Sequence, residues 1–575
     1  MATKRIPLIG SLINRNADTY NYKTYDQRFV NCFPEFTKNA ATGQVRAFLL
    51  KRPGFFLTAS GPASSLGTPG VLIWSGSTNQ YPLFCFFNSG ASSLTVYDLG
   101  GVTIGGAAIP AVSFVPGARL SETTVSATPY IVLMARLSSD WQHHAWFTNE
   151  FGTSWTEITD AQFVPNATLG TVTGSIAGFT LTTTVSSTGV NLPIGTRLGG
   201  NGVSFATQIK AIGTAVAGVG TYTVSITQSV SSRTITALDN WLVGNAVHVD
   251  GYMFVMDKNG VIWNSDLNSL SSWAATSSLA AQTSPDGGVG LAKTKNLIIG
   301  FGVGSIEFFQ NAGNATGSPL TRIGSATVKI GAYIKQDAVQ AIETITTIGD
   351  DVYFIGQNLE SAVVGIYKIS GTSITKISNA NVDKSIQKNT KSWGFVGVTN
   401  FLSMQHLILA TSSTLYDTFA YCIDTGIWWV FQTGLGVPSA IVGYSGNAYI
   451  TTLSLGYYLV NSQLGWMENA LPLSMTIQTQ SLDQDTNRTK FYQSAELICD
   501  SQTISGNISI SWSDDDYATF STARTIDSST GLKRIKRLGS TMGRYNNKRA
   551  WKITESVDRP FRGEALDIEY TVGEI

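Results

Sequence analysis

Charge is scarce in this sequence. Only 13% of the 575 residues are Asp, Glu, Lys or Arg, about half of the roughly 25% that is typical of soluble domains. The 38 basic residues equal the 38 acidic ones, which excludes a uniformly basic nucleic-acid binder. Disorder is excluded as well, because a chain with 43% hydrophobic and 11% aromatic residues can bury a core. The length predicts at least two domains or one large closed repeat.

Cysteine and histidine are also rare, with four of each. No two cysteines have the spacing of a metal site, and each is expected to be a buried thiol in a reducing compartment. His143 and His144 are adjacent, but neighbours in a strand point to opposite faces and cannot easily share a metal. The segment 483–488 opens like a calcium loop but lacks the required glycine.

Catalytic signatures are missing too. The sequence contains no P-loop, G-x-G-x-x-G, G-x-S-x-G or HExxH motif. We therefore expect no enzymatic activity, no metal and no cofactor.

No apolar run approaches the length of a membrane span. The longest, such as 83–87 and 297–301, fall far short of the roughly 20 residues that are needed. The N-terminal apolar stretch is broken by Pro7 and Gly10 and is not a convincing signal peptide. We expect a protein that is soluble when made and has no membrane insertion of its own.

Short strand-like runs are abundant instead, and helical periodicity is hard to find. Five hairpin patterns begin at Gly251, Asn296, Asp351, His406 and Asn447. Their spacing of about 40 to 55 residues is typical of four-stranded propeller blades. The segments 71–97 and 130–155 could supply further blades. The sequence thus predicts an all-β fold with a β-propeller-like platform over 61–166 and 239–470.

Two segments resemble the Asp-box, S-x-D-x-G-x-T-W, a turn between outer propeller strands. The first is 148–155, in which Glu150 replaces the aspartate. The second is 513–520, in which Tyr517 replaces the glycine.

Composition divides the rest of the chain. Residues 167–238 are dominated by Thr, Ser, Gly and Val and are expected to form a small inserted β module, because propeller loops tolerate insertions. Residues 471–575 predict a C-terminal β-sandwich-like domain. Residues 1–60 are expected to be an N-terminal extended segment with the first strands.

One basic stretch interrupts the low charge. Residues 533–562 hold ten basic and two acidic residues, a net +8 that leaves −8 for the remainder. We predict assembly or DNA-backbone contacts here; the alternative is an ordinary solvated strand-and-turn surface. The candidate residues are Lys533, Arg534, Lys536, Arg537, Arg544, Lys548, Arg549 and Lys552.

Several phrases resemble one family, the packaged-DNA stabilisation and tail nozzle (tail hub) proteins of short-tailed bacteriophages. Asn31-Cys32-Phe33-Pro34 and Arg52-Pro53-Gly54 stand where the family has N-x-(Y/F)-P and R-x-x-P-G. The segments 284–291 and 305–309 are similar to its "PDG-I-G … GSSTIEYF" signature, and 534–552 to its C-terminal phrase. The motif residues to which the resemblance gives structural roles are Pro34, Arg52, Pro53, Gly54, Pro285, Asp286, Gly287 and Glu307.

The resemblance implies a structural virion protein. Family members form a hexameric tube below the portal and adaptor rings, retain the packaged genome and form the conduit for its ejection. The implied partners are further copies of the chain, the tail adaptor ring, tail fibres or spikes, the host surface, and double-stranded DNA held without sequence specificity. The implied location is the virion tail, after synthesis in the host bacterial cytoplasm.

An alternative function stays open. The degraded Asp-boxes are also compatible with a receptor- or glycan-binding tail propeller, either an adhesin or a sialidase-like depolymerase. The hairpins carry almost no arginine, however, whereas a sialidase-like site would need a cluster of arginines around the propeller axis.

Overall fold

The structure is a computed structural model of the chain. It describes all residues except 1, 10–27, 39–42, 60–64, 76–79, 89–92, 99–102, 111–117, 138–140, 151, 164–167, 205, 282–283, 285, 315, 325–327, 333–343, 359–362, 389–392, 412–416, 453–456, 461–464, 502–503, 528–534, 539–541, 546–547 and 574–575. Apart from one helix, α1 (Ala380–Lys388), the regular elements of the described residues are strands. The predicted all-β fold is confirmed. No helix in these ranges is long and apolar enough to cross a membrane.

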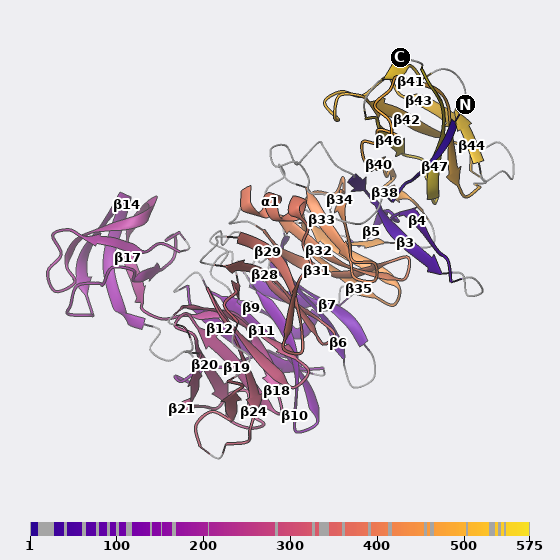
Figure 1. The fold of residues 1–575 in the computed structure, drawn as a ribbon. Helices are drawn as coiled ribbons and strands as arrows, with labels where there is room; N and C mark the ends of the chain where they lie inside the picture. Colours follow the sequence, from indigo (N-terminus) through magenta and orange to yellow (C-terminus); the bar gives the residue numbers. More distant parts are fainter. Residues whose placement is uncertain are drawn as a thin grey trace.

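The described strands form seven blades (Figure 1). Blade 1 contains β6 (Ser65–Ser75), β7 (Gln80–Asn88), β8 (Ser93–Tyr97) and β9 (Thr103–Pro110). Blade 2 contains β10 (Arg119–Val125), β11 (Thr128–Arg136), β12 (His143–Asn149) and β13 (Thr156–Glu157). Blade 3 contains β18 (Leu242–Val249), β19 (Tyr252–Asp257), β20 (Val261–Ser265) and β21 (Trp273–Ala280). Blade 4 contains β22 (Gly288–Thr294), β23 (Leu297–Gly302), β24 (Ile306–Asn311) and β25 (Leu320–Arg322).

The last three blades are less regular. Blade 5 contains β26 (Gly331–Ala332), β27 (Ile345–Ile348), β28 (Asp351–Asn358), β29 (Val363–Ser370) and β30 (Ser373–Lys376). Blade 6 contains β31 (Trp393–Phe401), β32 (Met404–Thr411), β33 (Thr418–Cys422) and β34 (Ile427–Phe431). Blade 7 contains β35 (Pro438–Tyr444), β36 (Asn447–Thr452) and β37 (Tyr457–Val460), and its fourth strand is β5 (Phe55–Ala59) from the N-terminal part of the chain.

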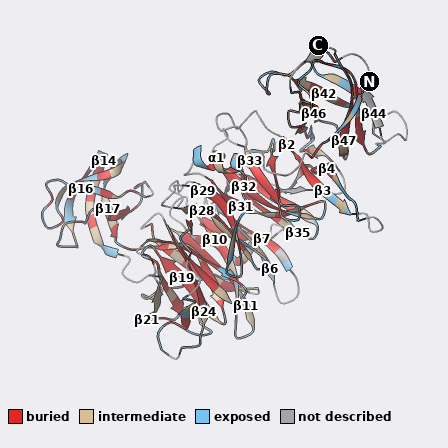
Figure 2. Ribbon diagram, in the orientation of Figure 1, coloured by how far each residue is buried: buried red, intermediate tan, exposed pale blue. Residues whose placement is uncertain are grey.

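The blades close into a ring. The first strands of successive blades are neighbours, and β35 of blade 7 returns to β6 of blade 1. Separate apolar cores lie between successive blades: Trp74 and Trp146 are buried between blades 1 and 2, and Phe301 and Phe354 between blades 4 and 5. Figure 2 shows this burial along the propeller strands. The five hairpins predicted from the sequence are the second and third strands of blades 3 to 7.

Blades 6 and 7 are joined into one sheet at the ring centre. β31 and β35 pair in parallel, with Gly397 opposite Ile441. A Cβ atom on Gly397, whose φ is +140°, would lie 1.9 Å from the Ile441 carbonyl oxygen. Only glycine therefore permits this approach.

The inserted module protrudes from the side of the propeller, between blades 2 and 3 (Figure 1). It contains β14 (Thr168–Ser186), β15 (Arg197–Gly199), β16 (Ile209–Ile212) and β17 (Gly220–Leu238). These strands form their own sheet around their own apolar core. Thr168 pairs with Leu238, so the module enters and leaves the propeller at adjacent points.

The C-terminal domain is a two-sheet sandwich that also contains N-terminal strands. One sheet contains β1 (Ala2–Pro7), β3 (Cys32–Lys38), β4 (Val45–Lys51), β41 (Lys490–Cys499), β44 (Ile535–Leu538), β45 (Arg544–Tyr545) and β47 (Arg562–Val572). The other contains β40 (Met475–Gln478), β42 (Asn507–Ser513), β43 (Arg524–Asp527) and β46 (Ala550–Glu555), with β2 (Arg28–Val30) at its edge. A short hairpin, β38 (Met467–Glu468) and β39 (Leu471–Pro472), precedes the sandwich.

The N-terminal segment over 1–60 supplies strands to both large domains. β1, β3 and β4 belong to the sandwich, and β5 belongs to blade 7. The reason is strand pairing across almost the whole chain: Ala2 lies opposite Tyr570, and Phe55 opposite Val460.

Candidate functional site: the junction of propeller and sandwich

β2 connects the two large domains. It pairs in parallel with β34 of blade 6 at Val30 and Val430, and antiparallel with β40 of the sandwich. One hydrogen-bonded sheet thus runs from blade 6 into the sandwich.

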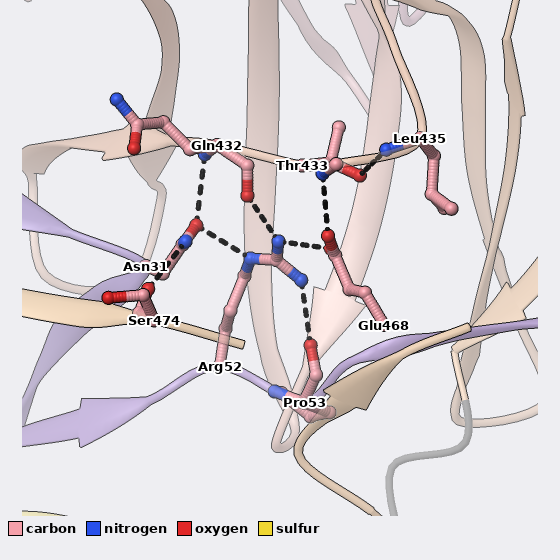
Figure 3. Close-up of polar contacts among 9 residues, drawn as sticks. Asn31, Arg52, Pro53, Gln432, Thr433, Leu435, Glu468 and Ser474 are labelled. Atoms are coloured by element: carbon pink, nitrogen blue, oxygen red, sulfur yellow. Dashed lines mark hydrogen bonds and ion pairs between the residues drawn. The ribbon is translucent and has the colours of Figure 1, made fainter. Parts of the chain in front are cut away.

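The family-like segments 31–34 and 52–54 meet at this junction next to β2 (Figure 3). The backbone N–H of Arg52 donates to the Asn31 carbonyl at 3.0 Å, and Arg52 Nε donates to Asn31 Oδ1 at 2.9 Å. Asn31 Oδ1 also accepts from the Gln432 N–H at 2.9 Å, and Asn31 Nδ2 donates to the Ser474 carbonyl at 2.9 Å. Asn31 therefore links blade 6 with the first residues of the sandwich.

Arg52 is the centre of the network. Its guanidinium forms an ion pair with Glu468 and donates to the carbonyls of Gln432 and Pro53. Glu468 Oε2 accepts from the Gly434 N–H at 2.8 Å. Arg52 is completely buried, and its guanidinium lies 4.6 Å from the centroid of the Phe431 ring. Burial lowers the pKa of Arg52, and Glu468 opposes that shift.

The segment Arg52-Pro53-Gly54 must end in glycine because no side chain fits at position 54. A Cβ atom there would lie 1.8 Å from the Met467 carbonyl oxygen. The chain can therefore approach the 467–468 hairpin, and bring Glu468 to Arg52, only with no side chain at this position. Pro34, from the other phrase, is buried in β3 opposite Leu49.

A second buried cluster, inside the sandwich, joins β4 to β46 of the facing sheet. Glu555 accepts from Lys51 Nζ and from Arg559 Nε, both at 2.7 Å, and none of the three side chains is more than 1% exposed. Burial is also the main cause that lowers the pKa of Lys51. A buried carboxylate shared by two cations is costly unless all three are held together, so this cluster joins the two sheets of the sandwich, which contain β4 and β46.

A cavity of about 620 Å³ lies beside the Arg52 network. Asn31, Asp417 and Glu468 supply side-chain oxygens to its wall, but each already accepts or pairs within the protein. The described residues contain no group of three or more His, Cys, Asp or Glu that could hold a metal. The chemistry of this junction is structural: it locks two domains.

The family-like segments 284–291 and 305–309 stabilise blade 4 in a similar way. Asp286 accepts from the Gly304 N–H at 2.7 Å and from Ser305 Oγ at 3.0 Å, which fixes the turn between β23 and β24. Glu307 is buried and pairs with Arg322 at 2.6 Å on the neighbouring strand. Gly287 lies close to the Lys258 carbonyl, and Pro285 is outside the described residues.

The basic stretch is only partly a surface feature. Lys533 and Arg534 lie outside the described residues, and Lys536, Arg537 and Arg544 lie in β44 and β45, where the structure describes the backbone alone. Lys548 is exposed, and Lys552 is half-buried with its ammonium 5.1 Å from the Phe520 ring centroid.

Arg549 requires a correction. Its side chain is 1% exposed and forms a bidentate pair with Asp514, with both N–O distances at 2.6 Å. Its guanidinium also stacks 4.0 Å from the Tyr492 ring centroid. Arg549 is therefore an internal residue rather than a contact for DNA or a partner. The sequence could not show this, because its carboxylate partner lies 35 positions away.

The second segment that resembles an Asp-box, 513–520, is a hydrogen-bonded turn of the sandwich between β42 and β43 and does not belong to a propeller blade. Asp515 Oδ1 accepts from Ser513 Oγ at 2.8 Å and from the Thr519 N–H at 2.9 Å. The Thr519 hydroxyl, which donates to Asp515 Oδ2, is the main cause that lowers the pKa of Asp515 to about 2, and the other two bonds add to its effect. Tyr517 occupies the glycine position with φ +68°, and its hydroxyl donates to the Thr479 carbonyl at 3.0 Å.

Other candidates from the sequence have structural surroundings. All four cysteines are buried and free, as predicted. His143 accepts from Arg136 Nε at 3.1 Å, whereas His144 pairs with Glu157, so the two histidines do not share a ligand. The residues that sequence reasoning missed are Glu468 and Gln432; neither lies in a recognisable motif.

The fold and the junction define a class: an all-β structural protein in which a seven-bladed ring is locked to a sandwich. A family model described as "Bacteriophage P22 Gp10, beta-propeller" matches residues 171–450. This is the family that the phrases in the sequence resemble, so the resemblance is confirmed over the matched residues. The matched range contains nearly all of the module and most of blades 3 to 7.

Other comparisons add little. A catalytically inactive virginiamycin B lyase from Staphylococcus aureus with quinupristin has 10% identity and a TM-score of 0.31, covering 75% of this chain and 99% of that one. BamB from Moraxella catarrhalis has 8% identity and a TM-score of 0.30, covering 72% and 98%. Similarities this weak carry no argument about activity. No curated protein sequence matches the chain.

Proposed function

We propose that this chain is the tail nozzle subunit of a short-tailed phage. In this proposal six copies form a ring below the portal and adaptor, retain the packaged DNA, and form the conduit through which the genome leaves. The observation that carries the proposal is the family match over the propeller.

The construction of the junction supports this function. A nozzle must withstand the pressure of packaged DNA without letting its domains turn against each other. The continuous sheet through β2 and the Arg52 network resist such a rotation. Breaking the buried Arg52 network would cost several kcal/mol.

Charge supports a passive conduit. Arg549 and Arg559 of the basic stretch are buried in pairs with carboxylates, and Arg562 is paired with Glu35. DNA affinity grows with the number of phosphates that free cations neutralise. With fewer free cations on the wall of the proposed channel, DNA would slide through it more easily. Exposed residues such as Lys548 remain for contacts with a neighbouring subunit or the adaptor.

The test combines symmetry and DNA retention. Electron microscopy of the purified protein should show closed rings with six-fold symmetry. Phage particles made without the protein should package DNA and then lose it, as measured by nuclease-accessible DNA, and supplying the protein in trans should restore retention. Particles that keep their DNA without the protein would contradict the proposal. Cleavage of host surface polysaccharide by the purified chain would favour the depolymerase instead.

A further inference from the structure

A cavity of about 580 Å³ lies on the axis of the propeller, because the innermost strand of every blade contributes to its wall. In the described part of the chain, β6, β10, β18 and β22 each pair with one neighbouring strand, so one backbone edge of each is open toward the axis. The volume lies within the roughly 300–1,000 Å³ of small-ligand sites. This axial cavity therefore has room and backbone hydrogen-bonding groups for a small molecule.

Two lysines of blade 4 line the axial cavity, and within the described ranges neither forms an ion pair. Lys293 lies near the end of β22 and Lys295 in the turn that follows, and both are exposed. Lys293 Nζ donates to the His248 carbonyl at 3.2 Å. Asp351, the carboxylate near Lys295, is already paired with Lys368 at 2.7 Å. The charges of the two lysines are thus available to an anionic group of a ligand.

The imidazole beside these lysines is neutral. His248 Nε2 lies 3.1 Å from Ser121 Oγ, a contact that joins blade 3 to blade 2 in the cavity wall. Burial, together with the charge of Lys293, lowers the pKa of His248 to about 3. At neutral pH the ring therefore contributes polar atoms and no charge, and the positive potential on this side of the cavity comes from the lysines.

Two carboxylates flank the lysines around the cavity. Glu122 is in β10 of blade 2 and Asp350 is in the turn after β27 of blade 5, and both side chains are exposed. Glu122 Oε2 accepts from the Ser75 N–H at 2.8 Å. An ionised carboxylate only accepts hydrogen bonds. A ligand that fits must therefore carry hydrogen-bond donors as well as an anionic group.

The rest of the lining distinguishes between ligands of that kind. The hydroxyls of Ser121, Thr346 and Thr347 and the open strand edges can both donate and accept. Several ligand hydroxyls match such a wall better than one ammonium group, which only donates. Leu72 and Leu291 add apolar surface for a carbon skeleton. A sugar with an acidic group has all of these features, whereas an amino acid lacks the hydroxyls.

The geometry points to the axial cavity as a binding site for an acidic saccharide unit, in which Lys293 and Lys295 hold the carboxylate or phosphate and Glu122 and Asp350 accept from the hydroxyls. The unit is either a free sugar acid or the end of a longer glycan, which share this chemistry. The inference goes beyond the proposed nozzle function, since it gives the propeller a ligand and does not depend on the ring.

Titration calorimetry of the purified full-length chain tests the site. Glucuronate and glucose 6-phosphate should bind, and glucose should bind at least about tenfold more weakly. Lys293→Met combined with Lys295→Met should weaken binding of both acids at least about tenfold, with an unchanged thermal midpoint because both lysines are exposed. Lys210→Met combined with Lys548→Met removes two exposed lysines outside the cavity and is the matched control, which should bind like the wild type.

A second variant tests the position of the site without changing charge. Thr347 is exposed on β27 at the cavity wall, and Thr347→Trp should block the cavity and abolish binding of both acids. Methyl glucuronide separates the two sources: binding as tight as that of glucuronate supports the end of a longer glycan, and weaker binding supports a free sugar acid.

Three results would overturn the site. They are the absence of binding of either acid at millimolar concentrations, wild-type affinity in the double methionine variant or in Thr347→Trp, and tighter binding of glutamate than of glucuronate. Because the assay needs neither rings nor DNA, each of these results leaves the nozzle proposal standing, and that proposal fails on its own test of symmetry and DNA retention.

Discussion

The guanidinium of Arg52 and the carboxylate of Glu468 form a buried ion pair between residues 416 positions apart. The pair joins the end of a sandwich strand to the hairpin that follows the last blade. We expect Arg52→Met to lower the free energy of unfolding by about 3–5 kcal/mol, because it leaves a buried carboxylate without its cation. Urea unfolding followed by tryptophan fluorescence measures the loss.

The control for this change is Arg5→Met. Arg5 pairs with Asp567 at 2.9 Å, but its side chain is 59% exposed, so the expected loss is below about 1 kcal/mol. Equal losses for the two variants would contradict the assigned importance of the junction. Adding Glu468→Leu to Arg52→Met should recover part of the stability, since no unpaired charge then remains.

Arg549 and Lys548 make a matched pair for the basic stretch. Each change to Gln removes one positive charge, one position apart. Arg549→Gln should destabilise by about 3–5 kcal/mol, because Asp514 loses its bidentate partner, whereas Lys548→Gln should stay within about 0.5 kcal/mol. Thermal midpoints distinguish the two. If Arg549→Gln were as stable as the wild type and only weakened adaptor or DNA binding, the internal role of Arg549 would be wrong.

Gly397 holds blades 6 and 7 together. Gly397→Ala should cost more than about 4 kcal/mol or prevent soluble expression, because the new methyl group meets the Ile441 carbonyl. Gly371→Ala is the control: Gly371 also has a positive φ, +62°, but has nothing within 4 Å of the added atom, so its cost should be about 1–2 kcal/mol. Comparable yields and melting temperatures would rule out the close approach.

His406 makes stability depend on pH. It is fully buried, with its ring centroid 4.6 Å from that of Phe33 and 5.6 Å from that of Trp429. Burial lowers the pKa of His406 from about 6.5 to about 3. The native state therefore holds the neutral ring, and protons favour the unfolded chain at any pH below 6.5. This stability contribution is complete above pH 6.5 and falls by about 1.4 kcal/mol per pH unit down to pH 3.

A non-titrating substitution tests that dependence. His406→Asn should flatten the decline of the urea midpoint between pH 7 and pH 5 relative to the wild type, even if it lowers the midpoint at pH 7. His144→Asn is the control and should change the slope far less, because its pair with Glu157 is partly exposed to solvent and weak. A wild-type slope in the His406 variant would show that other groups cause the decline.

Local patterns predicted the blades because, apart from β5 in blade 7, each blade is built from strands that follow one another in the sequence. The hairpin at Gly251, for example, contains its turn and both strands within a few residues, so period and turn chemistry were sufficient. The phrases around Asn31 and Arg52 could be recognised as related to a family, but their meeting point could not be derived, because nothing local indicates that Gln432 and Glu468 complete the network.

The errors have one physical cause, which is pairing over long distances along the chain. β1 and β47 are at opposite ends of the sequence, and neither has a pattern that specifies the other. Arg549 looked like a surface cation because lysines and arginines surround it, and the sequence does not show that Asp514 removes it from water. A charge count along the chain measures composition, whereas the exposure of each charge is set by tertiary contacts.

The pairing of the chain ends also sets an order of events during synthesis. The ribosome makes β1, β3 and β4 first, but β47, which pairs with both β1 and β4, begins only at residue 562. At roughly 5–20 residues per second, these early strands wait for tens of seconds with unpaired edges, and β5 likewise waits for β37 before blade 7 is complete. The propeller ring can therefore close only after residue 460, and the sandwich only after β47 has been made. Assembly of complete subunits with other copies must follow synthesis of that last strand.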